Sequence, residues 1–301
     1  MKNICINATM KTVVLIFGTI LTLASCGDVY DLNGFDWEAE TPLSDSVFNR
    51  EIRVLNYGDN LPSGHNPLDD MDPMLFSLEK FSSVNLNYKT TERWDISFSG
   101  IFRSSIGVNN GKSQGIGYGS SAIGGIAVLD TPYSKLMHVP ENISFSSPGD
   151  IGLDAQGTLS YKTGHAVYTF GGNFVRPDKV SGYDESDPKA VQEANLYRHM
   201  IYCLSEDLIA AFPNAKNLQG KPLRPRTIVI KTARGNFVKL ETQSVYKGVK
   251  DPLLMRRGYT VPIYTFRYMA IKADEQRFGF VTRRPALSVN MSTNTVSVQK
   301  N

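Results

Sequence analysis

Alternation of apolar and polar residues dominates the chain and predicts β-strands. Within 263–271, Tyr264, Phe266 and Tyr268 recur with the two-residue period that places them on one face of a strand. Runs rich in β-branched and aromatic residues extend the same prediction to other segments. The predicted strands are 51–57, 74–78, 84–88, 93–98, 123–129, 159–170, 227–232, 237–245, 263–271 and 278–282.

Two of these stretches organise the rest of the chain. In the segment 93–98, the two-residue period predicts that Trp94, Ile96 and Phe98 face the core together. A stacking role for Trp94 against a ligand is the alternative interpretation. The runs 227–232 and 237–245 flank a short polar turn in which Gly235 can adopt the positive φ that a hairpin needs.

A helix-like pattern occurs once, between about 189 and 212. Leu196, Met200 and Leu204 follow helical spacing, Asp187 is a candidate N-cap, and Pro188 suits the first turn. We therefore expect one mostly β domain over 51–301 with a helical insert. The glycine-rich segment 101–125 lacks the order of residues that a phosphate-binding loop requires, and close approach of strands explains its glycines better.

The N-terminal segment has the features of a bacterial lipoprotein signal. An apolar run from 12 to 24 follows Lys11 and is too short to span a membrane. It ends in Leu-Ala-Ser-Cys, so we expect removal of residues 1–25 and acylation, for example by palmitate, at Cys26. An ordinary secretory signal with a chance cysteine is the alternative. Residues 26–50 are acidic near their start and are expected to form a tether.

Net charge, cysteine content and the absence of catalytic motifs each bear on which functions we expect. The formal net charge of +3 falls to +1 without the first 25 residues, which carry Lys2 and Lys11 and no acidic residue. This balance gives no electrostatic reason to expect a nucleic-acid partner. Outside the leader and Cys26 only Cys203 remains, so we expect a buried thiol rather than a disulfide. No nucleophile elbow, zinc motif or carboxylate pair is evident, and we expect no enzymatic activity.

A family resemblance rests on the two organising stretches. Trp94-Asp95-Ile96-Ser97-Phe98 and the segment 228–240 resemble the signature and the C-terminal hairpin of the HmuY-like haem-binding lipoproteins of Bacteroidota. The similarity covers roughly residues 75 to 280. It implies a β-domain that binds haem at the outer membrane, on the cell surface, and passes it to a TonB-dependent receptor.

The same resemblance implies axial iron ligands on separate loops. By position, the first ligand is Met137 or His138, and the second is His165. Histidine and methionine are common axial ligands where haem is held without oxygen chemistry. A surface adhesion or glycan-binding lipoprotein that has the fold without haem is the alternative function.

Overall fold

The computed structural model describes residues 47–59, 71–146, 150–153, 164–278 and 285–298. The contacts divide the chain into Met1–Glu38 and Ala39–Asn301, and only the second unit contains described residues. Cys26 and the predicted signal sequence lie outside them. The described part is mostly β, as the sequence predicts. None of its helices is long and apolar enough to cross a membrane.

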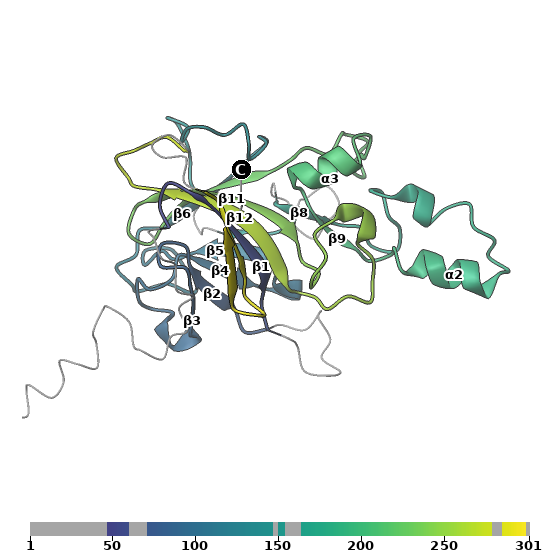
Figure 1. The fold of residues 1–301 in the computed structure, drawn as a ribbon, viewed down its shortest axis with the longest axis horizontal. Coiled ribbons are helices and arrows are strands. Elements are labelled where there is room, and N and C mark those ends of the chain that lie inside the picture. The colour runs from purple at the N-terminus through teal and green to yellow at the C-terminus, as the bar shows by residue number, and fades with distance from the viewer. Residues whose placement is uncertain (1–46, 60–70, 147–149, 154–163, 279–284, 299–301) are drawn as a thin grey trace, which may run out of the picture. The chain divides into compact units, whose positions relative to one another are not determined.

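Two β-sheets form the body of this unit (Figure 1). The seven-stranded sheet has the order β14-β13-β1-β12-β11-β10-β6, and the five-stranded sheet has the order β3-β2-β4-β5-β7. The seven-stranded sheet comprises β1 (Glu51–Tyr57), β6 (Gly125–Leu129), β10 (Thr227–Lys231), β11 (Phe237–Ser244), β12 (Tyr264–Ile271), β13 (Leu287–Asn290) and β14 (Thr295–Val298). The five-stranded sheet comprises β2 (Met74–Ser77), β3 (Ser82–Val84), β4 (Ile96–Ser99), β5 (Ser105–Val108) and β7 (Asp150–Ile151).

The main core lies between the two sheets and is rich in aromatic rings. Phe76 on β2 meets Phe266 on β12 edge to face, with ring centroids 5.8 Å apart, and Phe98 on β4 lies 4.3 Å from Tyr264. The predicted face of Tyr264, Phe266 and Tyr268 is confirmed, because all three are fully buried. Such ring pairs add about 0.5–1.5 kcal/mol beyond the area that they bury.

The predicted hairpin forms as β10 and β11, with Ile228 opposite Leu240 in an antiparallel register. Gly235 adopts a φ of 93° in the turn, where a side chain would be strained. Some of the glycines in the segment 101–125 act as expected, whereas Gly115 and Gly119 have open space around them. A Cβ at Gly111 would collide with the carbonyl of Ser120, and one at Gly124 with the carbonyl of Asn109.

The predicted long helix is wrong. The segment forms α2 (Pro188–Asn195), then β9 (Ile201–Cys203), then α3 (Glu206–Ala211). Asp187 does cap α2 by accepting a hydrogen bond from the amide of Lys189 at 2.9 Å. The helix ends at Asn195, the backbone at His199 has a left-handed φ of 56°, and β9 then pairs with β8 (Ala166–Tyr168). Sheet pairing thus overrides an apolar stripe with helical spacing.

Trp94 does not share a face with Ile96 and Phe98. It is fully buried, as predicted for a core residue, but it packs with Leu75 and Val84 on the opposite side of the five-stranded sheet. The chain bends at Asp95 and β4 begins only at Ile96, so the two-residue period does not extend back to Trp94.

Other boundaries shift less. The predicted strand 84–88 is replaced by β3, which ends at Val84, and a short 3-10 helix. Most of the predicted strand 278–282 and part of 159–170 lie outside the described residues. Packing already begins at Val47, whose side chain is buried in the main core. Cys203 is buried and unpaired with another cysteine, and burial raises the pKa of its thiol to about 12.

Candidate functional site

Met137 and His138 lie on a segment that covers the outer face of the seven-stranded sheet. Both side chains are exposed, Met137 by 43%. The backbone is extended, because His138 forms an antiparallel bridge with Arg277, the amide of Phe278 donates to the carbonyl of Met137 at 2.9 Å, and that of Val139 donates to Gln276 at 3.0 Å. Adjacent side chains in an extended segment point to opposite sides, so Met137 and His138 face different ways.

A buried lysine fixes this segment to the sheet. The ammonium of Lys239 on β11 donates to the carbonyls of Tyr133 and Leu136, at 3.1 Å and 3.0 Å. It also lies 4.3 Å from the centre of the Tyr133 ring, and the guanidinium of Arg267 lies 4.3 Å from the same ring. Cation–π contacts of this kind contribute about 0.5–2 kcal/mol each. Burial lowers the pKa of Lys239 to about 8.

Arg267 anchors the rest of this outer face. Its guanidinium donates to Glu241 at 2.7 Å and to Glu206 at 2.5 Å. Glu206 in turn accepts from the amide and the hydroxyl of Ser134, at 2.9 Å and 2.6 Å. Burial raises the pKa of Glu241, whereas the hydrogen bonds from Ser134 and Arg267 outweigh burial and lower the pKa of Glu206. The network therefore holds the start of the segment that carries Met137.

His165 occupies a different environment, inside the core. Its ring is 1% exposed, with Nδ1 3.0 Å from the hydroxyl of Thr242 and Nε2 2.8 Å from the carbonyl of Ser104. Burial lowers its pKa to about 4, because the charged form loses its hydration. Both ring nitrogens already have hydrogen-bond partners, so this arrangement leaves neither of them open to an iron atom.

The three predicted iron ligands are not brought together. On β11, Leu240 and Thr242 face the main core, and His165 contacts Thr242 on that side. Lys239 faces the other side, where it holds Leu136 and hence the segment of Met137 and His138. The sheet itself separates His165 from the other two. We therefore set aside a joint site and keep Met137 and His138 as the accessible members.

A second group of side chains with ligand chemistry was not predicted as a site. The hydroxyl of Tyr168 lies 2.8 Å from Nδ1 of His199 on the surface, beside the ring of Phe170 at a centroid distance of 4.9 Å. The sequence places Tyr168 and His199 31 residues apart. The two residues meet only because β8 pairs with β9, so their spacing in the sequence did not indicate the contact.

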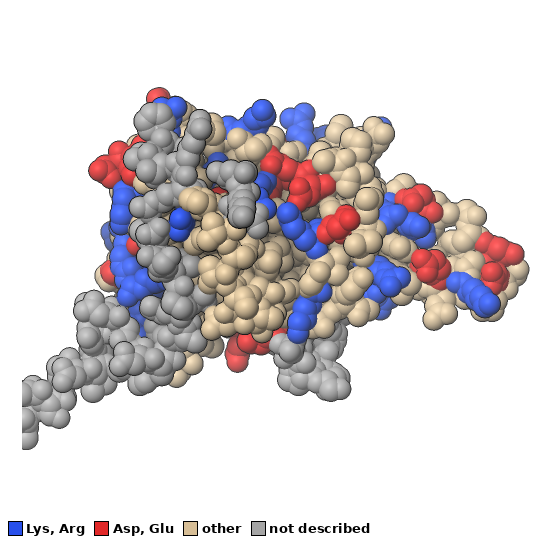
Figure 2. Space-filling model, viewed as in Figure 1, with Lys and Arg blue, Asp and Glu red and all other residues tan. Residues whose placement is uncertain are grey.

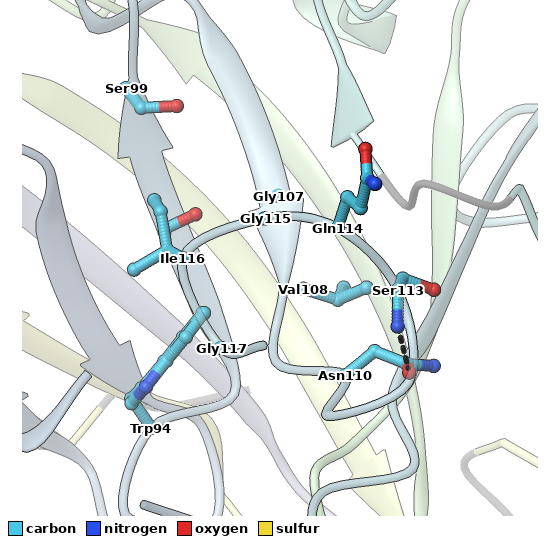
Figure 3. Close-up of a pocket in the computed structure, with 11 residues that line it drawn as sticks. Trp94, Ser99, Gly107, Val108, Asn110, Ser113, Gln114, Gly115, Ile116 and Gly117 are labelled. Carbon is cyan, nitrogen blue, oxygen red and sulfur yellow. Dashed lines mark hydrogen bonds between the residues drawn. The ribbon is translucent and has the colours of Figure 1, made fainter. Parts of the chain in front are cut away.

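A cavity of about 290 Å³ lies on the outer face of the five-stranded sheet (Figure 3). The loop 110–117 arches over β5, with Trp94 and Ile116 on one side of the cavity and Ser113 and Asn110 on the other. The volume is at the lower end for small-molecule sites. Every lining residue is uncharged. They are Trp94, Ser97, Ser99, Gly107, Val108, Asn110, Ser113, Gln114, Gly115, Ile116 and Gly117.

Two further features of the described residues concern surface charge and possible metal ligands. Figure 2 shows basic and acidic residues interspersed around α2 and α3, and an uncharged strip over β13 and β14. No group of three or more His, Cys, Asp or Glu side chains in the described ranges is arranged to hold a metal ion. His199 and Cys203, which are four residues apart in the sequence, belong to no such group.

Comparison with known proteins adds weak structural similarity. No family model matches the chain, and no curated protein matches it. Among solved structures, the chain is similar to one from Bacteroides vulgatus that is named as a HmuY-like haem-binding protein. The identity is 14%, the match covers 65% of this chain and 84% of that one, and the TM-score is 0.23. Agreement at this level establishes neither a shared fold nor a shared ligand.

Proposed function

We propose that the chain is a haem-binding lipoprotein that captures haem at the cell surface and passes it to a TonB-dependent outer-membrane receptor. The observation that carries the proposal is the exposure of Met137 and His138 on a segment fixed at both ends. Their thioether and imidazole are ordinary axial ligands of haem iron. The backbone bridge to Arg277 and the lysine contacts at Leu136 hold the segment without occupying either side chain.

One haem takes one of these two ligands. Because Met137 and His138 point to opposite sides of an extended segment, a single iron atom cannot bind both. Arg277, opposite His138 in the backbone bridge, is of the residue type that binds carboxylates in a bidentate manner and suits a haem propionate. The protein binds without turnover, so exchange of the axial ligand controls release to the receptor.

The proposal places the chain at the outer membrane through lipid at Cys26. The apolar run before Cys26 and the acidic residues after it support this location. Cells that lack the protein are then expected to grow more slowly when a limiting amount of haemin is their iron source. Equal growth of the two strains across haemin concentrations would exclude a role in haem supply.

The direct test is a titration of the purified protein with haemin, followed by visible absorption in both oxidation states. We expect saturable binding, with one equivalent at the segment of Met137 and His138. Met137→Ala and His138→Ala are compared with Lys135→Ala, which changes an exposed residue of the same segment that carries neither a thioether nor an imidazole. A broad, non-saturating change in the unmodified protein would refute haem binding.

A second candidate function is supported by the cavity beneath the loop 110–117. Its uncharged lining of hydroxyl, amide and apolar groups suits a small neutral ligand such as a sugar unit of a glycan. A glycan array probed with haem-free protein tests this candidate. Ser99→Leu, which fills the cavity from β4, should abolish any signal, and binding that survives the substitution would place the glycan elsewhere.

A further inference from the structure

Four aromatic side chains from three separate segments meet around Tyr168 at the surface. The Tyr168 ring lies 4.9 Å from Phe170, 6.0 Å from His199 and 6.3 Å from Phe102. Phe170 is 37% exposed, His199 is exposed, and Tyr168 is half-buried. Exposed aromatic groups of this size usually serve a binding purpose when they cluster. We call these four residues the Tyr168 cluster.

Three of the four members have strained backbones. Phe102, Phe170 and His199 have φ values of 54°, 53° and 56°, in the left-handed region that bulky residues rarely adopt. Each such residue costs on the order of 1–3 kcal/mol, and strain of this kind concentrates at ligand sites. A hydrogen bond from the amide of His199 to the carbonyl of Phe170, at 2.6 Å, locks two of the strained residues together.

The polar contact within the cluster has a definite chemistry. Tyr168 Oη lies 2.8 Å from His199 Nδ1. In the tautomer with the proton on Nε2, the phenol donates to Nδ1, and the imidazole is placed to accept the phenolic proton. Burial raises the pKa of Tyr168, and the positive charge of Arg257 opposes that rise. Burial disfavours a phenolate here, whereas the Arg257 cation and a protonated His199 would stabilise it.

We propose that Tyr168 binds the iron of ferric haem through its phenolate oxygen, with His199 as the proton acceptor. This inference rests on the proposed haem function and names a position separate from Met137 and His138. On binding, the Tyr168 proton moves to His199 Nδ1, the bond from Oη to Fe(III) forms, and a water ligand leaves the iron. No electron is transferred.

The neighbours of Tyr168 suit haem in two ways. Phe102 and Phe170 offer apolar edges to the porphyrin, and Arg257 offers a cation to a propionate. Tyrosine is an established type of haem ligand, and a hard phenolate oxygen favours ferric over ferrous iron. Reduction of the iron should therefore weaken binding at Tyr168, whereas a thioether at Met137 prefers the softer ferrous state.

The test compares ferric haemin complexes of the full-length protein and three variants in detergent. Tyr168→Phe removes only the hydroxyl and keeps the ring contacts with Phe102 and Phe170. His199→Ala removes the proton acceptor, and Tyr118→Phe is the matched control because Tyr118 is 61% exposed and lies outside the cluster. Resonance Raman and visible spectra report a tyrosinate ligand through its own vibrations and its charge-transfer band.

We expect the tyrosinate signals in the unmodified protein and in Tyr118→Phe, and their loss in Tyr168→Phe. The variant His199→Ala should keep them only at higher pH and bind ferric haemin roughly 10- to 100-fold more weakly, as is usual when the partner of a metal ligand is removed. Haemin binding with no tyrosinate signal would overturn this inference and leave the proposed function intact. An unmodified protein that takes up no haemin would overturn both.

Discussion

The buried carboxylate of Asp95 links the two stretches that organise the fold. Its Oδ2 accepts hydrogen bonds from the amide of Leu78 at 2.7 Å and from that of Glu79 at 3.2 Å. Its Oδ1 accepts from the amide of Ala233, in the turn of the β10–β11 hairpin, at 3.1 Å. One side chain thus joins a turn of the five-stranded sheet to the hairpin of the other sheet. We predict that Asp95→Ala destabilises the protein strongly.

The size of the effect follows from the donors that lose their acceptor. The amides of Leu78 and Ala233 are both buried. Each buried donor left without a partner costs about 1–3 kcal/mol, so Asp95→Ala should lower the free energy of unfolding by about 2–6 kcal/mol. In Asp95→Asn, the side-chain oxygen can still accept the hydrogen bonds from the amides of Leu78 and Glu79. Only Ala233 then loses its acceptor, and the expected cost is about 1–3 kcal/mol.

The pH dependence of stability separates the effect of the Asp95 charge from the effect of its hydrogen bonds. Burial and then the charge of Glu79 raise the pKa of Asp95 from 3.8 to about 6. The folded state therefore binds the proton more tightly than the unfolded state, and the contribution of Asp95 to the stability of the unmodified protein falls by about 3 kcal/mol as pH rises from 3.8 to 6. Asp95→Asn lacks this titration. Its destabilisation relative to the unmodified protein should be largest near pH 4 and shrink toward pH 6.

Urea unfolding at pH 4, 5, 6 and 7 measures these differences, with the exposed Asp274→Asn as a control that should stay within about 0.5 kcal/mol. The reasoning would be refuted if Asp95→Ala changed the free energy of unfolding by less than about 1 kcal/mol. A pH-independent effect of Asp95→Asn would refute the electrostatic part alone.

Three further predictions concern other parts of the chain. Because burial lowers the pKa of His165 from 6.5 to about 4, the unfolded state binds its proton first, and the contribution of His165 to stability falls by about 3 kcal/mol as pH drops from 6.5 to 4. In urea unfolding, the stability of His165→Gln relative to the unmodified protein should rise over that range, and a constant difference would contradict this. Gly124→Ala should cost about 1–3 kcal/mol in the same assay because its Cβ meets the Asn109 carbonyl, whereas Gly115→Ala, with open space, should be nearly neutral. Cys26→Ser should abolish palmitate labelling in cells, and continued labelling would place the lipid elsewhere.

Much of the fold was predictable because strands leave a local signature. The alternation of Tyr264, Phe266 and Tyr268 marks β12, and Gly235 between two β-rich runs marks the hairpin. The prediction of a long helix used the same kind of local signal as the predicted strands, but here the signal was misleading. Leu196, Met200 and Leu204 have helical spacing, but the left-handed backbone at His199 and the pairing of β9 with β8 are decided by contacts far along the chain.

The candidate site was less predictable because a ligand residue is defined by its surroundings. Met137, His138 and His165 have the right side chains, yet only the first two are exposed. The ring nitrogens of His165 are hydrogen-bonded to the hydroxyl of Thr242 and to the carbonyl of Ser104, which lie 77 and 61 residues away in the chain. Nothing in the neighbouring sequence of a histidine reveals such partners.

The sequence by itself determined the mostly β character, most strand positions, the hairpin turn and the burial of Cys203, since these follow from local periodicity and residue type. The tertiary structure alone decided which faces meet. It placed Trp94 apart from Ile96, set a sheet between His165 and Met137, and brought Tyr168 to His199. The physical reason is that local propensities act within a few residues, whereas burial and hydrogen bonding are settled by strand pairing across the whole chain.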